Sequence, residues 1–247
     1  MRLREELPGD HAYDLILLSV PHYRFAAAAA FLGPRAGDAT VLVFNNFWAE
    51  PEAAAAPLPA GQLAWGFPRA GGGFQPDGTL RGALLGRVLL GTFGTAPGAR
   101  ERAVREAFRG AGFAVDETRD LRGWLLRHFA VNSGLHLEAL KAGGIRALMA
   151  SRAHREAIAH NVRELFPVLR ARGVEPGGEV APARLPPWLV GALLGAAPAL
   201  SPPLRAVLEG HANPDEVRAY CRDVLAEARR LGVAVPRLEA GEALFRA

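Results

Sequence analysis

Residues 13–44 have the sequence YDLILLSVPHYRFAAAAAFLGPRAGDATVLVF. The apolar run from Tyr13 to Val20 is typical of a strand buried on both faces of a parallel sheet, and Pro21 ends it. An alanine-rich helical stretch follows over residues 25–32, and residues 40–44 form a second strand-like run after a Gly-Pro break. Strand, helix and strand in this order predict a right-handed crossover unit of an α/β domain.

Further elements of this domain follow. They are predicted strands over residues 62–67, 87–92 and 113–117 and a helix over residues 98–110. The loop RAGGGFQPDG, residues 69–78, has the glycine, proline and aspartate of turns, so we place its glycines 71–73 in a hairpin loop. The α/β portion is expected to end near residue 118.

The rest of the chain has helical patterns. Helices are predicted over residues 121–142, 151–172, 185–194 and 214–231. Asn213 before Pro214 is a helix start signal, and Gly232 lies where a C-cap glycine belongs. The expected fold class is α/β plus all-α, with an incomplete Rossmann-like parallel sheet domain over residues 1–118 and a helical domain over residues 119–247.

The composition excludes several classes of protein. Half of the 247 residues are hydrophobic and 22% are charged, as in a soluble globular protein. The net charge of +4 is spread along the chain, which argues against nucleic-acid binding. The N-terminus has no export signal, and the apolar run 188–200 is too short for a membrane span, so we expect a buried helix there. With Cys221 as the single cysteine, the cytoplasm is the expected location.

The segment WLLRHFAVNSGLHLEALKAGG, residues 124–144, contains a polar stripe. Steps of four residues from Trp124 place His128, Asn132, His136 and Leu140 on one helix face. Buried imidazoles and amides need hydrogen-bond partners, so such a stripe usually faces a cleft or another polar element. They could also be satisfied core or interface side chains. A metal site is not expected, because His128 and His136 lie about 12 Å apart along the helix.

Three more side chains are candidates for ligand binding. Glu216 lies in the first turn of its predicted helix, where a carboxylate either interacts with the helix dipole or binds a ligand. Asn45 and Asn46 directly follow a predicted parallel strand, where open α/β sheets place ligand-binding residues. Turn-forming asparagine is the competing interpretation for these two.

Together, in this order, these segments resemble the ketopantoate reductase family. The matching segments are YDLILLSV from Tyr13, FNN ending at Asn46, Trp124 with HFAVN ending at Asn132, and DEVRAYCRDVLAEARRLGVAVP ending at Pro236. The resemblance spans nearly the whole chain, although each motif alone is weak. It implies a Rossmann-like domain and a helical domain, with the active site in the cleft between them.

The resemblance also implies an activity and a set of site residues. The reaction would be hydride transfer from NADPH to a 2-oxo acid, by an oxidoreductase whose helical domains often pair into homodimers. Glu216 and Asn132 match the family's glutamate and the asparagine of its A-V-N motif, and Asn45 matches the asparagine after the strand. We therefore assign His128 and Glu216 as catalytic, Asn132 and His136 as substrate-binding, and Asn45 and Asn46 as cofactor-binding.

The chain departs from the family pattern at important positions. His128 occupies the position of the family's general-acid lysine, and His136 replaces a second asparagine. Lys141 cannot substitute, because it lies about 20 Å along the helix from His128. The sequence has no G-x-G-x-x-G to hold a dinucleotide, and we interpret GTFGTAPG at residues 91–98 as a turn.

Three hypotheses follow from these departures. The first is an NADPH-dependent reductase whose true start lies upstream of Met1, since Tyr13–Val20 would otherwise form an exposed sheet edge. The second is a short paralogue that binds no dinucleotide and acts as a helical dimerisation or interaction module. The third is an enzyme that uses His128, Asn132 and Glu216 for other chemistry on a small carboxylate.

Overall fold

The structure is a computed structural model that describes residues 6–8, 10–75, 77–210 and 213–246. The first five residues, part of the segment expected to lack an export signal, lie outside the described residues. The chain divides into two compact units. Unit 1 comprises residues 1–69 and 86–122, and unit 2 comprises residues 70–85 and 123–247. The division predicted at residue 118 differs from this mainly because the segment 70–85 belongs to unit 2.

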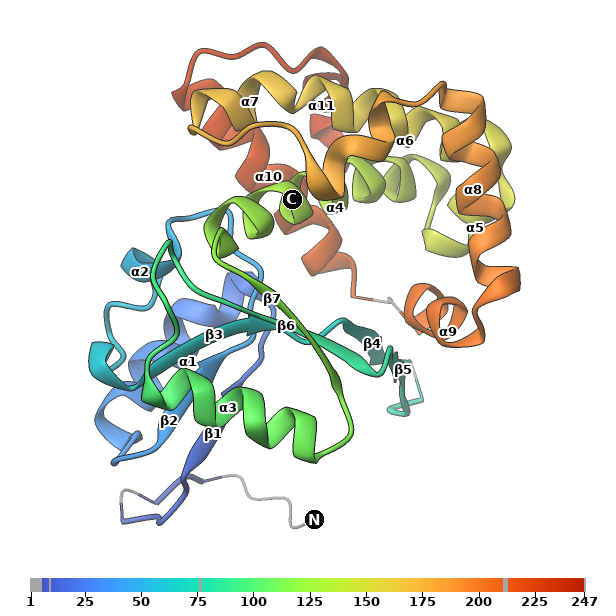
Figure 1. The fold of residues 1–247 in the computed structure, drawn as a ribbon. Helices are drawn as coiled ribbons and strands as arrows, with labels where there is room; N and C mark the ends of the chain where they lie inside the picture. Colours follow the sequence, from blue (N-terminus) through green and yellow to red (C-terminus); the bar gives the residue numbers. More distant parts are fainter. Residues whose placement is uncertain (1–5, 9, 76, 211–212, 247) are drawn as a thin grey trace. The chain divides into compact units, whose positions relative to one another are not determined.

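Unit 1 is built on a twisted sheet whose strands have the order β1-β2-β3-β6-β7 (Figure 1). The strands are β1 (Leu15–Leu18), β2 (Thr40–Val43), β3 (Leu63–Phe67), β6 (Arg87–Gly91) and β7 (Ala114–Thr118). Its helices are α1 (Phe25–Leu32), α2 (Pro51–Ala54) and α3 (Ala99–Gly110), with 3-10 turns at His22–Arg24, Gly33–Arg35 and Ala60–Gln62.

The sheet is mixed, whereas the sequence predicts parallel strands. β1, β2 and β3 run parallel, as do β6 and β7, but β3 pairs with β6 in the antiparallel sense. After β3 the chain leaves unit 1 through residues 70–85 and returns directly into β6, with no crossover helix between them. A strand that returns without a crossover pairs antiparallel with the one before it.

Strand β1 lies at the edge of the sheet, so the predicted burial of this strand on both faces is wrong. Its one partner among the described strands is β2. Leu18 is buried, but 54% of the Leu17 side chain is exposed. Leu17 and Leu18 point to opposite faces, so one face of β1 is covered and the other is not, and the free edge leaves one row of backbone groups open.

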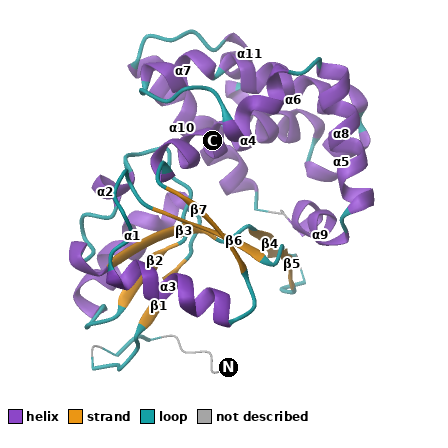
Figure 2. Cartoon of the chain, in the orientation of Figure 1, coloured by secondary structure: helices purple, strands orange, loops and turns teal. Residues whose placement is uncertain are grey.

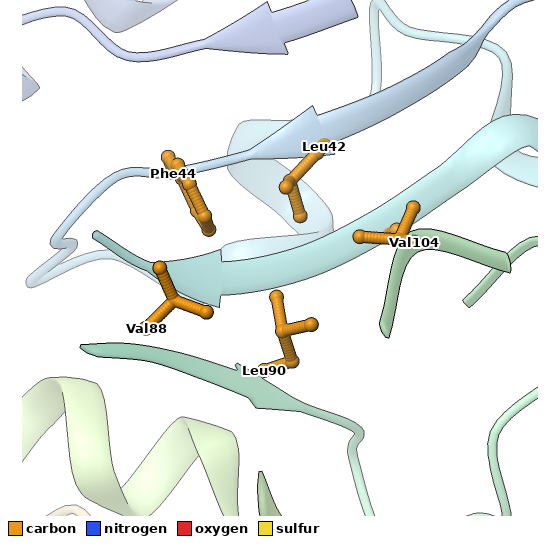
Figure 3. Packing of buried hydrophobic residues seen from close by; sticks show 6 residues of the cluster. Leu42, Phe44, Val88, Leu90 and Val104 are labelled. Carbon is orange, nitrogen blue, oxygen red and sulfur yellow. The ribbon is translucent and has the colours of Figure 1, made fainter. Parts of the chain in front are cut away.

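The core of unit 1 lies between the sheet and α3. A cluster of apolar side chains fills this space. Leu42, Leu90 and Val104 in it are fully or almost fully buried, and Phe44 and Val88 lie beside them (Figure 3). Phe108 of α3 packs edge-on against Phe44. Alternate residues of β2 point to opposite faces, and all four are buried, so this strand is covered on both faces.

A glycine-rich hairpin lies between β3 and β6 in the sequence but belongs to unit 2. β4 (Ala70–Phe74) and β5 (Leu80–Leu84) pair antiparallel and pack against α9 (Pro202–Gly210). The glycines 71–73, predicted to form a loop, lie inside β4. A Cβ added at Gly71 would come within 2.5 Å of Val207, and one at Gly210 within 2.6 Å of the Arg81 carbonyl oxygen. Glycine is therefore used here to let a helix approach the strands closely.

The remainder of unit 2 is helical (Figure 2). Its helices are α4 (Leu121–Ala142, whose first two residues belong to unit 1), α5 (Ile145–Ala150), α6 (Arg152–Glu164), α7 (Phe166–Ala171), α8 (Pro187–Leu200), α9, α10 (Pro214–Arg230) and α11 (Pro236–Ala240), with 3-10 turns at Gly178–Arg184 and Glu242–Leu244. The helix predicted over residues 151–172 is divided at Leu165, because Pro167 has no N–H to continue the hydrogen-bond ladder.

Helix α8 is not the buried helix that the sequence predicts. One side packs on α6, but Leu193 is 53% exposed and Leu200 83% exposed. Among the described residues no single helix has the length and apolar character to cross a membrane. The segments 187–198 and 202–208 pass that test only as a pair bent by 106°.

Helix α4 crosses α6 at a glycine. A Cβ on Gly134 would lie 2.6 Å from Cγ2 and 3.2 Å from the backbone nitrogen of Val162. A side chain of any size at this position would have to push the two helices apart. The close approach keeps α4, which carries the polar stripe, in a fixed position on α6.

We predict that Gly134→Ala lowers the free energy of unfolding by about 1–3 kcal/mol, because overpacking outweighs the better helix propensity of alanine. Urea denaturation measures this loss of stability. Gly110→Ala in α3 is the matched control, since no heavy atom lies within 4 Å of the added Cβ. Equal stability of the two variants would contradict the crossing described here.

Candidate functional site

The polar stripe lies on α4 as the sequence predicts, and the helix spans Leu121–Ala142. His128 and Asn132 are half-buried, and His136 is buried. The rings of Trp124 and His128 stack with centroids 4.7 Å apart and planes 10° from parallel. The indole therefore fixes the orientation of the His128 imidazole, one turn further along the helix.

Helix α10 packs along α4 through Tyr220. Its ring centroid lies 4.3 Å from that of Phe129 and 4.8 Å from that of His136. One residue further, Cys221 Sγ donates to the Ser133 carbonyl at 3.7 Å. Burial raises the pKa of Cys221 to about 12, so this thiol stays protonated and is not a nucleophile near neutral pH.

The start of α10 carries Glu216. Asn213 caps the helix as predicted, because its Oδ1 accepts a hydrogen bond from the Asp215 nitrogen at 3.1 Å. Glu216 is half-buried and lies one turn before Tyr220, on the same side of the helix. The spacing predicts that its side chain shares the side of α10 on which Tyr220 contacts His136. The first-turn position also suits the capping interpretation.

A pocket of about 310 Å³ lies where the end of α4 meets the starts of α5 and α10. We call it the α4–α10 pocket. Its lining residues are Ala139, Leu140, Gly143, Gly144, Ile145, Asn213, Pro214 and Val217. Leu140 is the last member of the stripe, and Val217 directly follows Glu216. The pocket therefore lies at the end of the stripe on α4.

Asn45 and Asn46 belong to unit 1, at the carboxyl end of β2, and both are buried. The Asn45 amide donates to the Val20 carbonyl at 2.6 Å, and its Oδ1 accepts from the Val20 nitrogen at 3.4 Å. It thereby links the ends of β1 and β2. This bond gives Asn45 a structural role, as in the turn-forming interpretation, while a role toward a cofactor stays a prediction.

A buried carboxylate that the sequence reasoning missed lies on the opposite side of α4. Glu138 is 2% exposed and accepts hydrogen bonds from Lys141 Nζ at 2.9 Å, His154 Nδ1 at 2.8 Å and Asn161 Nδ2 at 2.9 Å. Arg237 Nη1 donates to Asn161 Oδ1 at 3.4 Å. The pair Glu138 and Lys141, three residues apart on a mostly apolar part of the helix and off the polar stripe, was the available signal.

These contacts set the ionisation of Glu138. Burial raises its pKa, but the hydrogen bonds from His154, Asn161 and Lys141 outweigh burial and leave the pKa below the usual 4.5. The carboxylate is therefore charged in the folded protein near neutral pH. Lys141, the single lysine of the chain, donates a hydrogen bond to Glu138 in this cluster. No role in the stripe is needed to explain it.

No protein-family model and no curated protein sequence matches the chain, but solved structures do. The 2-dehydropantoate 2-reductase from Geobacter metallireducens GS-15 is 21% identical, with a TM-score of 0.65 over 94% of this chain and 76% of that one. The dimeric ketopantoate reductase from Staphylococcus aureus is 13% identical, with a TM-score of 0.61 over 94% and 76%. D-mandelate dehydrogenase with NADH and anilino(oxo)acetate is 15% identical, with a TM-score of 0.67 over 98% and 77%.

The chain has the fold of the ketopantoate reductases. The ketopantoate reductase fold confirms the predicted fold class, a Rossmann-like sheet domain followed by helices. At these identities the likeness concerns the fold, so the roles of the individual stripe residues stay predictions.

We predict that Glu138→Gln lowers the free energy of unfolding at pH 7 by about 1–3 kcal/mol, because a charge-assisted buried network is broken. Folding lowers the pKa of Glu138, so its carboxylate stabilises the folded protein at any pH above the unfolded pKa of 4.5. This stabilisation is lost as the pH falls through the folded pKa. Urea denaturation from pH 7 to 3 should therefore show the two proteins converging in acid. If the stability difference between the two proteins is the same at every pH, or if the exposed control Glu106→Gln also converges with the wild type in acid, the prediction is wrong.

Proposed function

We propose that this chain is an oxidoreductase that reduces a 2-oxo acid to the 2-hydroxy acid, with a nicotinamide cofactor, NADPH, as the hydride donor. The observation that carries the proposal is the polar stripe of α4 facing the Tyr220 side of α10, on a fold shared with ketopantoate reductases and D-mandelate dehydrogenase. A cytoplasmic location is proposed because the single cysteine is buried and reduced.

His128 is proposed as the general acid. When hydride reaches the carbonyl carbon, the carbonyl oxygen must gain a proton to become the hydroxyl of the product. An imidazole ordinarily titrates near pH 6.5 and can supply that proton near neutral pH. The indole of Trp124, stacked at 4.7 Å, holds the ring in one orientation and presents a face that favours a positive charge.

The remaining side chains are proposed to bind the substrate. Asn132 lies one turn beyond His128, and His136 a further turn along, so both reach the same side of α4. Glu216, one turn before the Tyr220 that contacts His136, is proposed to reach this side from α10. Amide and imidazole groups can donate hydrogen bonds to a substrate carboxylate and carbonyl, and Glu216 is proposed as the second catalytic residue, which orients the proton donor.

The residues of this chain fit the cofactor incompletely. Asn45 and Asn46 lie at the carboxyl ends of the parallel strands, where a nicotinamide would bind, but the Asn45 amide already bonds Val20. The sequence offers no G-x-G-x-x-G turn for the pyrophosphate, and Pro21 follows β1. Accordingly, we assign to this chain only the steps of substrate binding and proton donation.

We predict that His128→Gln lowers kcat for 2-oxo acid reduction by about 10²- to 10⁴-fold, because general acid catalysis is lost, while substrate affinity changes little. The decrease of NADPH absorbance measures the rate, with His160→Gln on the exposed side of α6 as the control. A His128→Gln protein with full activity would exclude His128 as the acid.

A second candidate function, a helical dimerisation module, is favoured by the exposed side of α8. This helix, PWLVGALLGAAPAL, has no charged side chain, yet Trp188, Leu193 and Leu200 are more than half exposed. The solvent face of a surface helix is normally polar, so an apolar face indicates a covering partner. We propose a second copy of this chain, since a face without charges can pair with itself about a two-fold axis.

We predict a homodimer, about twice 26.3 kDa, that Leu193→Arg converts to a monomer because an unpaired charge would be buried in the interface. Light scattering after size exclusion gives the mass. Leu244→Arg changes a leucine of similar exposure outside α8 and should leave the dimer intact. If the wild-type protein is a monomer at a concentration of about 100 µM, this pairing is wrong.

A further inference from the structure

An ion pair joins the segment after β2 to the first turn of α4. Arg122 Nε donates to Glu50 Oε2 at 2.6 Å, and Arg122 Nη2 donates to Glu50 Oε1 at 2.7 Å. The two residues lie 72 positions apart in the chain, yet both belong to unit 1. Two parallel hydrogen bonds between a guanidinium and a carboxylate fix the direction of both groups, which a single hydrogen bond does not do.

On one side of this ion pair, the segment 45–50 is held firmly in unit 1. The ring of Phe47 packs edge-on against that of Phe25, with centroids 4.6 Å apart, and Phe47 and Trp48 are both buried. Glu50 is the exposed end of this segment and comes directly before α2. Its carboxylate is therefore presented from a fixed support.

On the other side, α4 begins in unit 1 with two residues. Unit 1 ends at Arg122, so Leu121 and Arg122 are the residues of α4 that it contains. Leu121 is fully buried, and its backbone nitrogen donates to the Thr92 carbonyl at 3.1 Å. A helix that is fixed at one residue can still tilt. Arg122 supplies a second fixed point, about 100° further around the helix axis.

The direction of α4 at its start is transmitted along the helix to the stripe. His128 lies six residues beyond Arg122, which is about 9 Å along the axis, so a tilt of about 10° would move it by about 1.5 Å. A misplacement of about 1 Å can slow a positioned reaction about 100-fold. The ion pair itself adds little stability, because 34% of the Arg122 side chain and 48% of the Glu50 side chain are exposed. Its effect is therefore expected on position.

We propose that Glu50 and Arg122 are a pair of positioning residues for the imidazole of His128. This inference rests on the proposed function, because it assumes that His128 donates the proton. The pair is assigned no contact with the reacting atoms, and it acts through the helix start to which it binds. A displaced imidazole would deliver the proton to the carbonyl oxygen less often, so kcat would fall while substrate binding stayed nearly the same.

The kinetic test compares Glu50→Gln, Arg122→Gln and the double variant on 2-oxo acids with small, branched and aromatic side chains. Each single variant should lower kcat by about 10- to 100-fold and change KM by less than about twofold. The double variant should be no slower than the slower single variant, because both substitutions remove the same bond. Arg122→Lys keeps the charge without the planar guanidinium and should stay at least about fivefold below the wild type.

A second measurement does not depend on activity. The amides of residues 125–128 bond to the first turn of α4, and their hydrogen exchange should be about two- to fivefold faster in both single variants. The control is Arg229→Gln, which removes a bidentate bond of the same kind in unit 2, where Arg229 donates to Glu242 at 2.9 and 2.7 Å. The control should leave kcat and the exchange of these amides as in the wild type.

The possible failures of the two ideas are distinct. If the wild type is active and either single variant keeps its kcat, or the two losses multiply in the double variant, the positioning role is wrong and the proposed function stands. Unchanged exchange at residues 125–128 also overturns the positioning role. A wild-type protein that reduces none of the acids would sink the proposed function and the role for His128, while faster exchange would still support the pair as the anchor of α4.

Discussion

The ring of Tyr220 lies against both Phe129 and His136, and the candidate site depends on this contact. It brings α10 onto the side of α4 where the stripe lies, and Glu216 lies one turn before Tyr220 on α10. Aromatic contacts at centroid distances of 4.3–4.8 Å are well defined in geometry, so the two helices are not free to slide. The side of α10 that carries Tyr220 therefore faces the stripe at His136.

The other side of α4 is held by two features of a different kind. Gly134 lets the backbone of α6 approach closely, and the Glu138 carboxylate binds His154 and Asn161 of the same helix. One contact depends on shape and the other on charge, and Asn161 joins them, because its amide nitrogen donates both to the Gly134 carbonyl at 3.1 Å and to the Glu138 carboxylate at 2.9 Å. With α6 on one side and α10 on the other, α4 presents its stripe as a fixed row of side chains.

Strong local patterns were predictable from the sequence, and features that depend on distant partners were not. The period of α4, the Asn213 cap and the parallel pairing of β1 with β2 follow from local signals. The burial of β1 and α8 was predicted wrongly, because an apolar run does not reveal whether a neighbour covers it. In the sequence, glycines 71–73 have the pattern of a turn. Their role becomes clear only in the structure, where α9, about 130 residues later, packs on the strand that contains them.

For the site, sequence patterns indicated which residues share a helix face but not what packs against them. The antiparallel β3–β6 pair and the Glu138 cluster were missed for the same reason. The central claim, that the stripe of α4 and Glu216 of α10 form one binding site, is tested most directly by a double-mutant cycle of Asn132→Ala and Glu216→Gln on the affinity for a 2-oxo acid, measured with pyruvate. A coupling energy above about 0.5 kcal/mol is predicted, and purely additive losses would contradict the claim.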